Sequence, residues 1–220
     1  MVKMNSNADL IFHYFTTLSE NQIWQIRQLD SLYSDWNAKI NVISRKDIGN
    51  LYEHHVLHSL SIARAIQFSA GTKILDIGTG GGFPGVPLAI LFPECSFKLI
   101  DSTGKKLKVV RAVAEAIGLK NVQTEHLRGE EEKGKYDFVV SRAVMPFPEL
   151  VRTIRKNISS HQNNPMPNGL FCLKGGDLTE ELLPFKGKAK VTLLSDDFQE
   201  EWFKEDKKLI YLPIQGKAKK

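Results

Sequence analysis

Apolar residues in the first part of the chain recur at helical spacing. Residues 19–22, Ser-Glu-Asn-Gln, are typical of a helix start in which side chains satisfy free backbone N–H groups. The stripe that follows comprises Ile26, Leu29, Tyr33, Trp36 and Ile40. Further helices are predicted over residues 10–18 and 53–66. We therefore expect residues 1–68 to form a helical N-terminal cap.

From residue 73 onward, short β-rich runs alternate with helical segments. Strands are predicted over residues 73–77, 96–101, 122–127, 136–141 and 169–174, and helices over residues 86–92, 107–117, 148–158 and 179–183. This alternation is typical of a parallel sheet. Two last runs, residues 191–195 and 208–212, are separated by a short acidic connection, which predicts an antiparallel pair at the sheet edge.

The predicted fold class is therefore α/β, with a seven-stranded, mostly parallel sheet, an antiparallel C-terminal strand pair and the helical N-terminal cap. We expect three segments in a single compact unit. They are the cap over residues 1–68, a cofactor-binding domain over residues 69–215 and a basic tail over residues 216–220.

Composition and charge narrow the classes of partner. The 220 residues are 42% hydrophobic and 25% charged, as in an ordinary globular chain, and a net charge of +5 favours polyanionic partners. Cys95 and Cys172 lie far apart, so neither a disulfide framework nor a zinc site is expected. His54 and His58 lack a third ligand, so no metal is expected. The longest stretch free of charged and strongly polar side chains, 80–93, is too short for a membrane span, and we expect a cytoplasmic protein with no membrane partner.

A glycine-rich segment follows the first predicted strand. Residues 76–85 contain Gly78, Gly80 and Gly82, whose missing side chains let backbone N–H groups and a helix start approach a ligand closely. Asp101 ends the second predicted strand, where an open α/β sheet places a carboxylate against ribose hydroxyls. Together these residues predict a pocket for a nucleoside cofactor.

More than one explanation fits such glycines. They could serve chain turning alone, and Gly80, Gly82 and Gly85 match the G-x-G-x-x-G pattern of dinucleotide enzymes. However, no tyrosine is followed four positions later by the lysine of short-chain dehydrogenases, and residues 104–106, Gly-Lys-Lys, lack the hydroxyl of a P-loop. S-adenosylmethionine remains, because its adenosine uses the same ribose carboxylate and its methionine half can lie beside the glycines.

The chain resembles the class I methyltransferases, and more narrowly the small-subunit ribosomal RNA (guanine-N7) methyltransferases, also called glucose-inhibited division B proteins. The resemblance covers almost the whole chain and implies a Rossmann-like fold. It rests on a series of blocks in order, namely residues 36–37 with Asn41, His55 with Ser59, and residues 78–88, 101–102, 104–106, 141–143 and 173–175. In one departure, His58 stands where the family usually has an acid, so no role of that carboxylate carries over.

The resemblance implies methyl transfer from S-adenosylmethionine to N7 of one guanine in 16S ribosomal RNA, position 527 in the family, with S-adenosylhomocysteine as the second product. The implied partner is 16S ribosomal RNA or the assembling small subunit, and we expect a monomer. The implied cofactor contacts are Gly78, Phe83, Gly129, Glu130 and Arg142. The geometry of the loop and of the sheet adds Gly80, Gly82 and Asp101 to the predicted cofactor contacts. For residues 128–133, which include Gly129 and Glu130, a plain surface turn is an almost equally good explanation.

Methylation at N7 needs no general base, because that nitrogen carries a free lone pair in the ring plane. We therefore name no obligatory catalytic residue. Arg142 and Lys174 follow the fourth and fifth predicted strands, at the sheet edge where ligands bind, and are candidates for positioning the guanine. The alternative for Arg142 is an ion pair with Glu149.

Basic residues also recur opposite the apolar stripe of the helix that follows Asp101. Lys105, Lys106, Lys108 and Arg111 are candidates for RNA binding, although a solvated helix surface explains them equally well. Two other functions stay open on the sequence. One is methylation of a small molecule, and the other is a noncatalytic, RNA-binding role in ribosome assembly.

Overall fold

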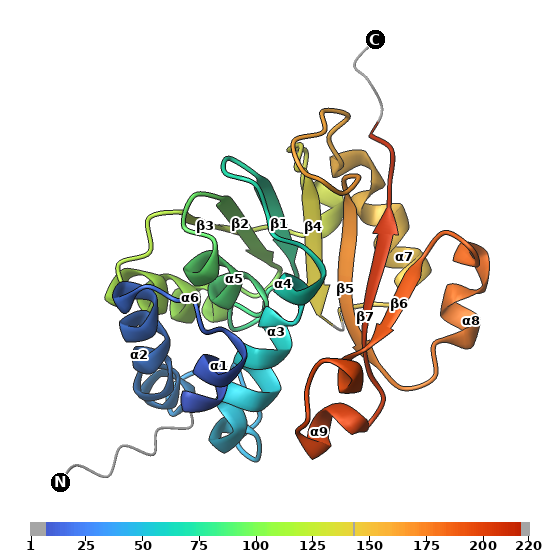
Figure 1. Ribbon diagram of the computed structural model, residues 1–220. Coiled ribbons are helices and arrows are strands. Elements are labelled where there is room, and N and C mark those ends of the chain that lie inside the picture. Colours follow the sequence, from blue (N-terminus) through green and yellow to red (C-terminus); the bar gives the residue numbers. More distant parts are fainter. Residues whose placement is uncertain (1–7, 143, 217–220) are drawn as a thin grey trace, which may run out of the picture.

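Seven strands form one mixed sheet in the computed structural model, which describes residues 8–142 and 144–216 (Figure 1). The strand order is β3-β2-β1-β4-β5-β7-β6. The bounds are β1 Lys73–Ile77, β2 Ser96–Asp101, β3 Val122–His126, β4 Phe138–Arg142, β5 Gly169–Gly175, β6 Lys190–Leu193 and β7 Lys207–Pro213. Strands β1 to β5 pair in parallel, and β7 is antiparallel to both β5 and β6. The predicted sheet is confirmed.

Helices cover both faces of this sheet, so its strands carry apolar residues at successive positions. Ile74, Leu99 and Val140 point to one face and belong to a cluster that includes α5 (Gly85–Leu91), α6 (Gly104–Ala116) and the cap. Their neighbours Leu75 and Val139 point to the other face. That face packs against α7 (Phe147–Ile154) and α8 (Thr179–Leu182).

The cap helices lie beside α5 and α6 (Figure 1). They are α1 Asp9–Tyr14, α2 Glu20–Asn37, a 3₁₀ turn at Ile48–Asn50, a π-helical segment at Leu51–Leu57, α3 His58–Leu60 and α4 Ile62–Ala65. The predicted capping box is present, because Ser19 Oγ accepts the Gln22 N–H and Gln22 Oε1 accepts the Ser19 N–H. The buried Tyr33 hydroxyl of α2 donates to the Gly81 carbonyl at 2.7 Å, which joins the cap to the glycine loop.

The structure corrects the ends and the geometry of several predicted elements. The second helix ends at Asn37, because its side chain bonds the backbone of Val42 and Ile43 and turns the chain. Residues 53–66 do not form one α-helix, since Leu51–Leu57 adopts the wider π geometry. The first helix ends at Tyr14, and the helix predicted over 148–158 ends at Ile154.

Two further features bear on the sequence predictions. Residues 217–220 of the predicted basic tail lie outside the described residues, as do residues 1–7 of the predicted cap. The last two strands are separated by a 3₁₀ turn at Leu194–Asp196 and by α9 (Glu201–Lys204). Among the described residues, no helix has the length and apolar character needed to cross a membrane.

The bond between the cap and the glycine loop can be tested directly. Tyr33→Phe removes the hydroxyl and leaves the Gly81 carbonyl without its partner, so we expect the free energy of unfolding to fall by about 1–3 kcal/mol. Urea denaturation measures this change. Trp24→Phe, at an exposed site of the same helix, is the control and should stay within about 0.5 kcal/mol of the parent. Equal values for the two variants would contradict the assignment.

Candidate active site

The carboxyl ends of the parallel strands bring the predicted site residues to one edge of the sheet. Ile77 of β1 pairs with Ile100 of β2, and Arg142 of β4 pairs with Leu173 of β5. The glycine loop, Asp101, Arg142 and Lys174 therefore occur at the ends of four neighbouring strands, where open α/β sheets bind their ligands. Glu130 follows the end of β3, the edge strand that pairs with β2.

The glycine loop depends on the absence of side chains at two positions. Gly78 has a φ of 66°, and a Cβ there would lie 2.3 Å from Val144 Cγ2. Gly82 has a φ of 99°, and a Cβ there would lie 2.7 Å from Val86 Cγ2 and 3.1 Å from the Tyr33 hydroxyl. Both positions therefore combine a left-handed backbone with close neighbours, which only glycine accommodates without strain.

Asp101 joins this loop to the segment after β2. Its Oδ2 accepts the Gly80 N–H at 2.9 Å, and its Oδ1 accepts the Thr103 N–H at 2.8 Å. A carboxylate offers about four lone-pair sites, so two backbone bonds leave acceptor capacity for ribose hydroxyls. The residue thus shapes the loop and keeps the acceptors that the sequence prediction requires.

A second carboxylate, Asp76, lies beneath the loop and is fully buried. Its Oδ2 accepts the Thr79 hydroxyl at 2.6 Å and the Gly85 N–H at 2.8 Å. Its Oδ1 has no hydrogen-bond partner among the described residues. Burial raises the pKa of Asp76 to about 7, because a charge without water is costly. Asp76 therefore anchors both ends of the loop.

Arg142 reaches from the end of β4 into the cap. Its Nη1 donates to the His54 carbonyl at 3.2 Å, its Nη2 lies 3.0 Å from His55 Nδ1, and its guanidinium carbon lies 5.2 Å from the centre of the Phe83 ring. Burial lowers the pKa of Arg142 to about 10, so the side chain is still cationic at neutral pH. These partners, and not Glu149, hold the guanidinium. Two predicted cofactor contacts, Phe83 and Arg142, are therefore neighbours.

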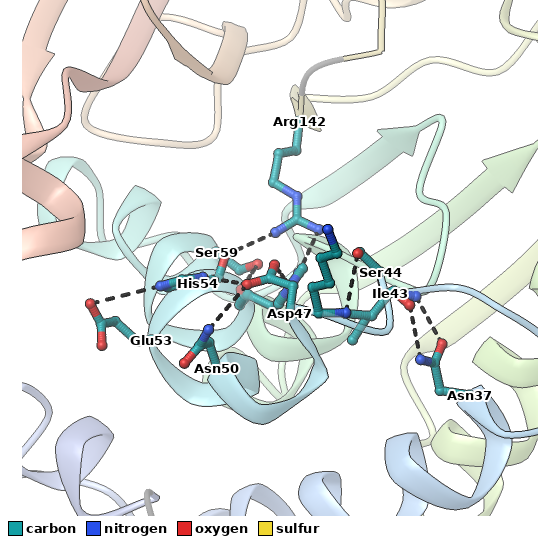
Figure 2. Close-up of polar contacts among 11 residues, drawn as sticks. Asn37, Ile43, Ser44, Asp47, Asn50, Glu53, His54, Ser59 and Arg142 are labelled. Carbon is teal, nitrogen blue, oxygen red and sulfur yellow. Dashed lines mark hydrogen bonds and ion pairs between the residues drawn. The ribbon is translucent and has the colours of Figure 1, made fainter.

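Asp47 of the cap contacts His54 (Figure 2) and His55. Its Oδ1 lies 2.5 Å from His54 Nδ1, and its Oδ2 lies 2.7 Å from His55 Nε2. Burial alone would raise the pKa of Asp47, but the hydrogen bonds from both imidazoles hold it below the usual value. Burial and the charge of Arg142 lower the pKa of His55 to about 4, so this ring is neutral at pH 7.

The other predicted site residues have contacts of their own. Lys174 forms an ion pair with Glu181 of α8, whose Oε2 also accepts the Phe147 N–H at 2.7 Å. Gly129 opens a 3₁₀ turn, and a Cβ there would lie 2.3 Å from Ile77 Cδ1, so the turn packs closely on the end of β1. Glu130 is exposed in this turn. Its role and that of Lys174 stay predictions.

The predicted basic residues lie along α6. Lys105, Lys108 and Arg111 are exposed, and Lys106 is half-buried. Arg111 Nε donates to the Thr124 hydroxyl at 2.6 Å. Within residues 8–142 and 144–216 none of the four forms an ion pair, so their charges are available to a polyanion.

Comparison with known proteins shows the family. The family model described as GidB, rRNA small subunit methyltransferase G, matches residues 22–210. Ribosomal RNA small subunit methyltransferase G of Bacteroides thetaiotaomicron is 62% identical over 206 residues, which cover 94% of this chain and 100% of that protein. Its counterpart from Phocaeicola vulgatus is 60% identical over 208 residues, covering 94% and 99%. The chain belongs to the rRNA small subunit methyltransferase G family. The resemblance inferred from the sequence and the assignment as a methyltransferase are thereby confirmed.

Solved structures with little sequence identity share the fold of this rRNA small subunit methyltransferase G family member. A precorrin-6y C5,15-methyltransferase from Geobacter metallireducens superposes with a TM-score of 0.54 at 14% identity, covering 80% of this chain and 91% of that one. A mutant of MtNAS in complex with S-adenosylmethionine gives 0.55 at 12% identity, covering 94% and 82%. The predicted Rossmann-like class I methyltransferase fold is confirmed.

His58, where the sequence departs from the usual family pattern, lies away from solvent against α9. Its ring makes an edge contact with Trp202 at 5.0 Å, and its Nε2 has no hydrogen-bond partner among the described residues. Burial lowers the pKa of His58 well below the usual value, so the ring is neutral. In this chain the position contributes to packing between the cap and α9.

Sequence reasoning assigned no function to Asp76 or Asp47. Asp76 lies within the glycine-rich segment, so its position directly before the loop was a usable signal. Asp47 gave none, because its partners His54 and His55 approach it only when the π-helical segment forms.

The raised pKa of Asp76 predicts a pH dependence of stability. The folded state holds this proton up to about pH 7, whereas the unfolded chain releases it near the ordinary value of 3.8. The protonated Asp76 carboxyl therefore stabilises the fold at low pH, and this contribution is lost as the pH rises toward 7. In Asp76→Asn the amide oxygen can accept both loop bonds without a charge, and this loss should disappear.

We accordingly expect the free energy of unfolding of Asp76→Asn, relative to the parent, to rise by roughly 2 kcal/mol between pH 5 and pH 8. Denaturation curves at both pH values measure it. Asp137→Asn serves as the comparison, because it also replaces a buried carboxylate that accepts a backbone N–H, that of Lys73 at 2.8 Å. A parent-to-variant difference that is independent of pH for Asp76→Asn would show that the carboxyl is already ionised at pH 5.

Proposed function

We propose that this protein transfers the methyl group of S-adenosylmethionine to N7 of one guanine in 16S ribosomal RNA, the guanine at position 527, in the cytoplasm. The proposal follows from membership of the rRNA small subunit methyltransferase G family. The observation that supports it best is the bond from Gly80 N–H to Asp101 Oδ2, which holds this carboxylate directly beside the glycine loop, where it would accept ribose hydroxyls. RNA free of protein or an assembling small subunit is the proposed partner.

The residues at the sheet edge fit this cofactor. Asp101 would accept ribose hydroxyls, and the loop at Gly78 and Gly82 offers backbone without Cβ atoms. Gly129 and Glu130 would lie along the adenine edge, and Phe83 and Arg142 would close the side toward the cap. When bound, S-adenosylmethionine supplies an electrophilic methyl group on a cationic sulfur.

Methylation at N7 requires the protein to align the N7 atom with the methyl group and to exclude water. The N7 lone pair forms the new bond to the methyl carbon, and the electron pair of the broken carbon–sulfur bond stays on sulfur. S-adenosylhomocysteine and a cationic guanine result, and no proton needs to be removed beforehand. Holding nucleophile and carbon in line can supply several kcal/mol of the barrier reduction.

Arg142 is suited to recognise guanine while leaving N7 free. A guanidinium only donates hydrogen bonds, and guanine presents the O6 acceptor next to N7. Adenine presents an amino group there, so two donors would face each other. Arg142 donating to O6 would therefore both orient the base and discriminate against adenine.

Incubation of the protein with methyl-labelled S-adenosylmethionine and unmodified 16S ribosomal RNA or small subunits tests the proposal. We expect label at N7 of a single guanine. Arg142→Ala should lower the rate about 10- to 100-fold, the loss expected for one good base contact. Cofactor binding without any methylation of RNA or subunits would reject the proposal, as would label at an atom other than a guanine N7.

The basic residues of α6 predict a salt dependence of RNA binding. Each phosphate that a lysine neutralises releases a counterion, so replacing both Lys105 and Lys108 with alanine should reduce the slope of log affinity against log salt by up to about 1.4. The matched control is Lys186→Ala with Lys190→Ala, because β6 is at the opposite edge of the sheet. Equal slopes for both double variants would show that Lys105 and Lys108 of α6 do not neutralise RNA phosphates.

A further inference from the structure

The cap carries a side chain that determines where the Arg142 guanidinium can lie. Arginine has only donors, so His55 Nδ1, 3.0 Å from Arg142 Nη2, must accept the hydrogen bond. The single ring proton of neutral His55 is then on Nε2, which donates to Asp47 Oδ2 at 2.7 Å. The contacts therefore fix one tautomer, with Arg142 donating to His55 and His55 donating to Asp47.

Asp47 is itself placed by the chain that leads to it. The Asn37 side chain accepts the N–H groups of Val42 and Ile43 at 2.8 Å and 2.9 Å and donates to the Ile43 carbonyl at 2.8 Å. The Asp47 N–H then bonds the Ser44 carbonyl at 2.8 Å. The carboxylate that orients His55 thus stands on a loop with fixed geometry.

Two of the five N–H donors of Arg142 are engaged by the cap, one by His55 and one by the His54 carbonyl. The Phe83 ring restricts the guanidinium further, with a distance of 5.2 Å to its carbon. The remaining donors keep a defined direction for an acceptor on a ligand.

We propose that His55 is a positioning residue for methyl transfer, which Asp47 holds in one tautomer so that its Nδ1 aims the Arg142 guanidinium. This inference rests on the proposed role of Arg142 toward guanine. It makes the helical cap part of the apparatus that orients the substrate. In this proposal His55 acts through Arg142 and has no direct contact with cofactor or base.

Two replacements of His55 separate aiming from mere bracing of the cap. Asparagine places an amide atom near the position of Nδ1, so His55→Asn keeps an acceptor for Arg142 and loses the bond to Asp47. Glutamine places its amide near Nε2, so His55→Gln keeps the Asp47 contact and loses the acceptor. We expect His55→Gln to lower the single-turnover rate constant about 10- to 100-fold and His55→Asn to retain most of it.

The measurement is single-turnover methylation of 16S ribosomal RNA at saturating cofactor and RNA, with the melting temperature of each variant recorded. His54→Gln is the matched comparison, because it loses an Asp47 contact but keeps the backbone carbonyl that accepts from Arg142. It should lose less activity than His55→Gln. Activity that simply follows the melting temperature across the three variants would overturn the proposal, as would a better rate for His55→Gln than for His55→Asn.

A double-mutant cycle separates this inference from the proposed function. If His55 acts through Arg142, His55→Gln should cause no further loss in an Arg142→Ala background. An equal loss in both backgrounds overturns the positioning role. If Arg142→Ala alone leaves the rate unchanged, the proposed role of Arg142 fails instead. If His55→Gln does not fold, Asp47→Leu and Asp47→Asn give the same contrast. Of these two replacements, only asparagine can accept the hydrogen bond from His55 Nε2–H. Equal methylation rates for the two variants would overturn the proposal.

Discussion

The positive charge of Arg142, held in a half-buried space between cap and sheet, is the constraint on which the site depends. Withdrawing a guanidinium from water is costly unless its donors find acceptors. Here a carbonyl, an imidazole nitrogen and an aromatic face supply that compensation, and Asp47 orients the imidazole that accepts from Arg142. The cap must therefore pack against the sheet, and the His55 ring must be neutral, for Arg142 at the end of β4 to keep these contacts.

The conformation of the glycine loop is likewise fixed by hydrogen bonds from residues around it. From below, Asp76 bonds Thr79 and Gly85, and from β2 the carboxylate of Asp101 bonds Gly80. From the cap, Tyr33 bonds the Gly81 carbonyl. Most residues of the loop are glycines, so its conformation is held by bonds from Asp76, directly before it, and from Asp101 and Tyr33, which are farther away in the sequence. This division lets the backbone stay accessible where a ligand binds.

The sequence predicted the sheet well, because strands buried on both faces produce apolar runs that helices interrupt at regular intervals. Helix ends were less predictable. The end of α2 depends on side-chain bonds from Asn37 to residues five and six positions later, which no periodicity reveals. The chemistry of the loop and Asp101 also follows from local pattern. The cap's share of the site does not, since Asp47 and Arg142 are joined only through tertiary contacts.

Chain length within Leu51–Leu57 fixes the directions of His54 and His55, which lie inside this π-helical segment. A π-helical turn closes by i→i+5 bonds, so it holds more residues than an α-helical turn covering the same distance. Deleting one residue there would allow ordinary helical winding over the same distance, but it would change the directions in which His54 and His55 point within the segment and so their contacts with Asp47. Such a segment tolerates changes of residue type more readily than changes of residue number. Insertions and deletions are therefore expected to be excluded from these seven positions when related chains diverge.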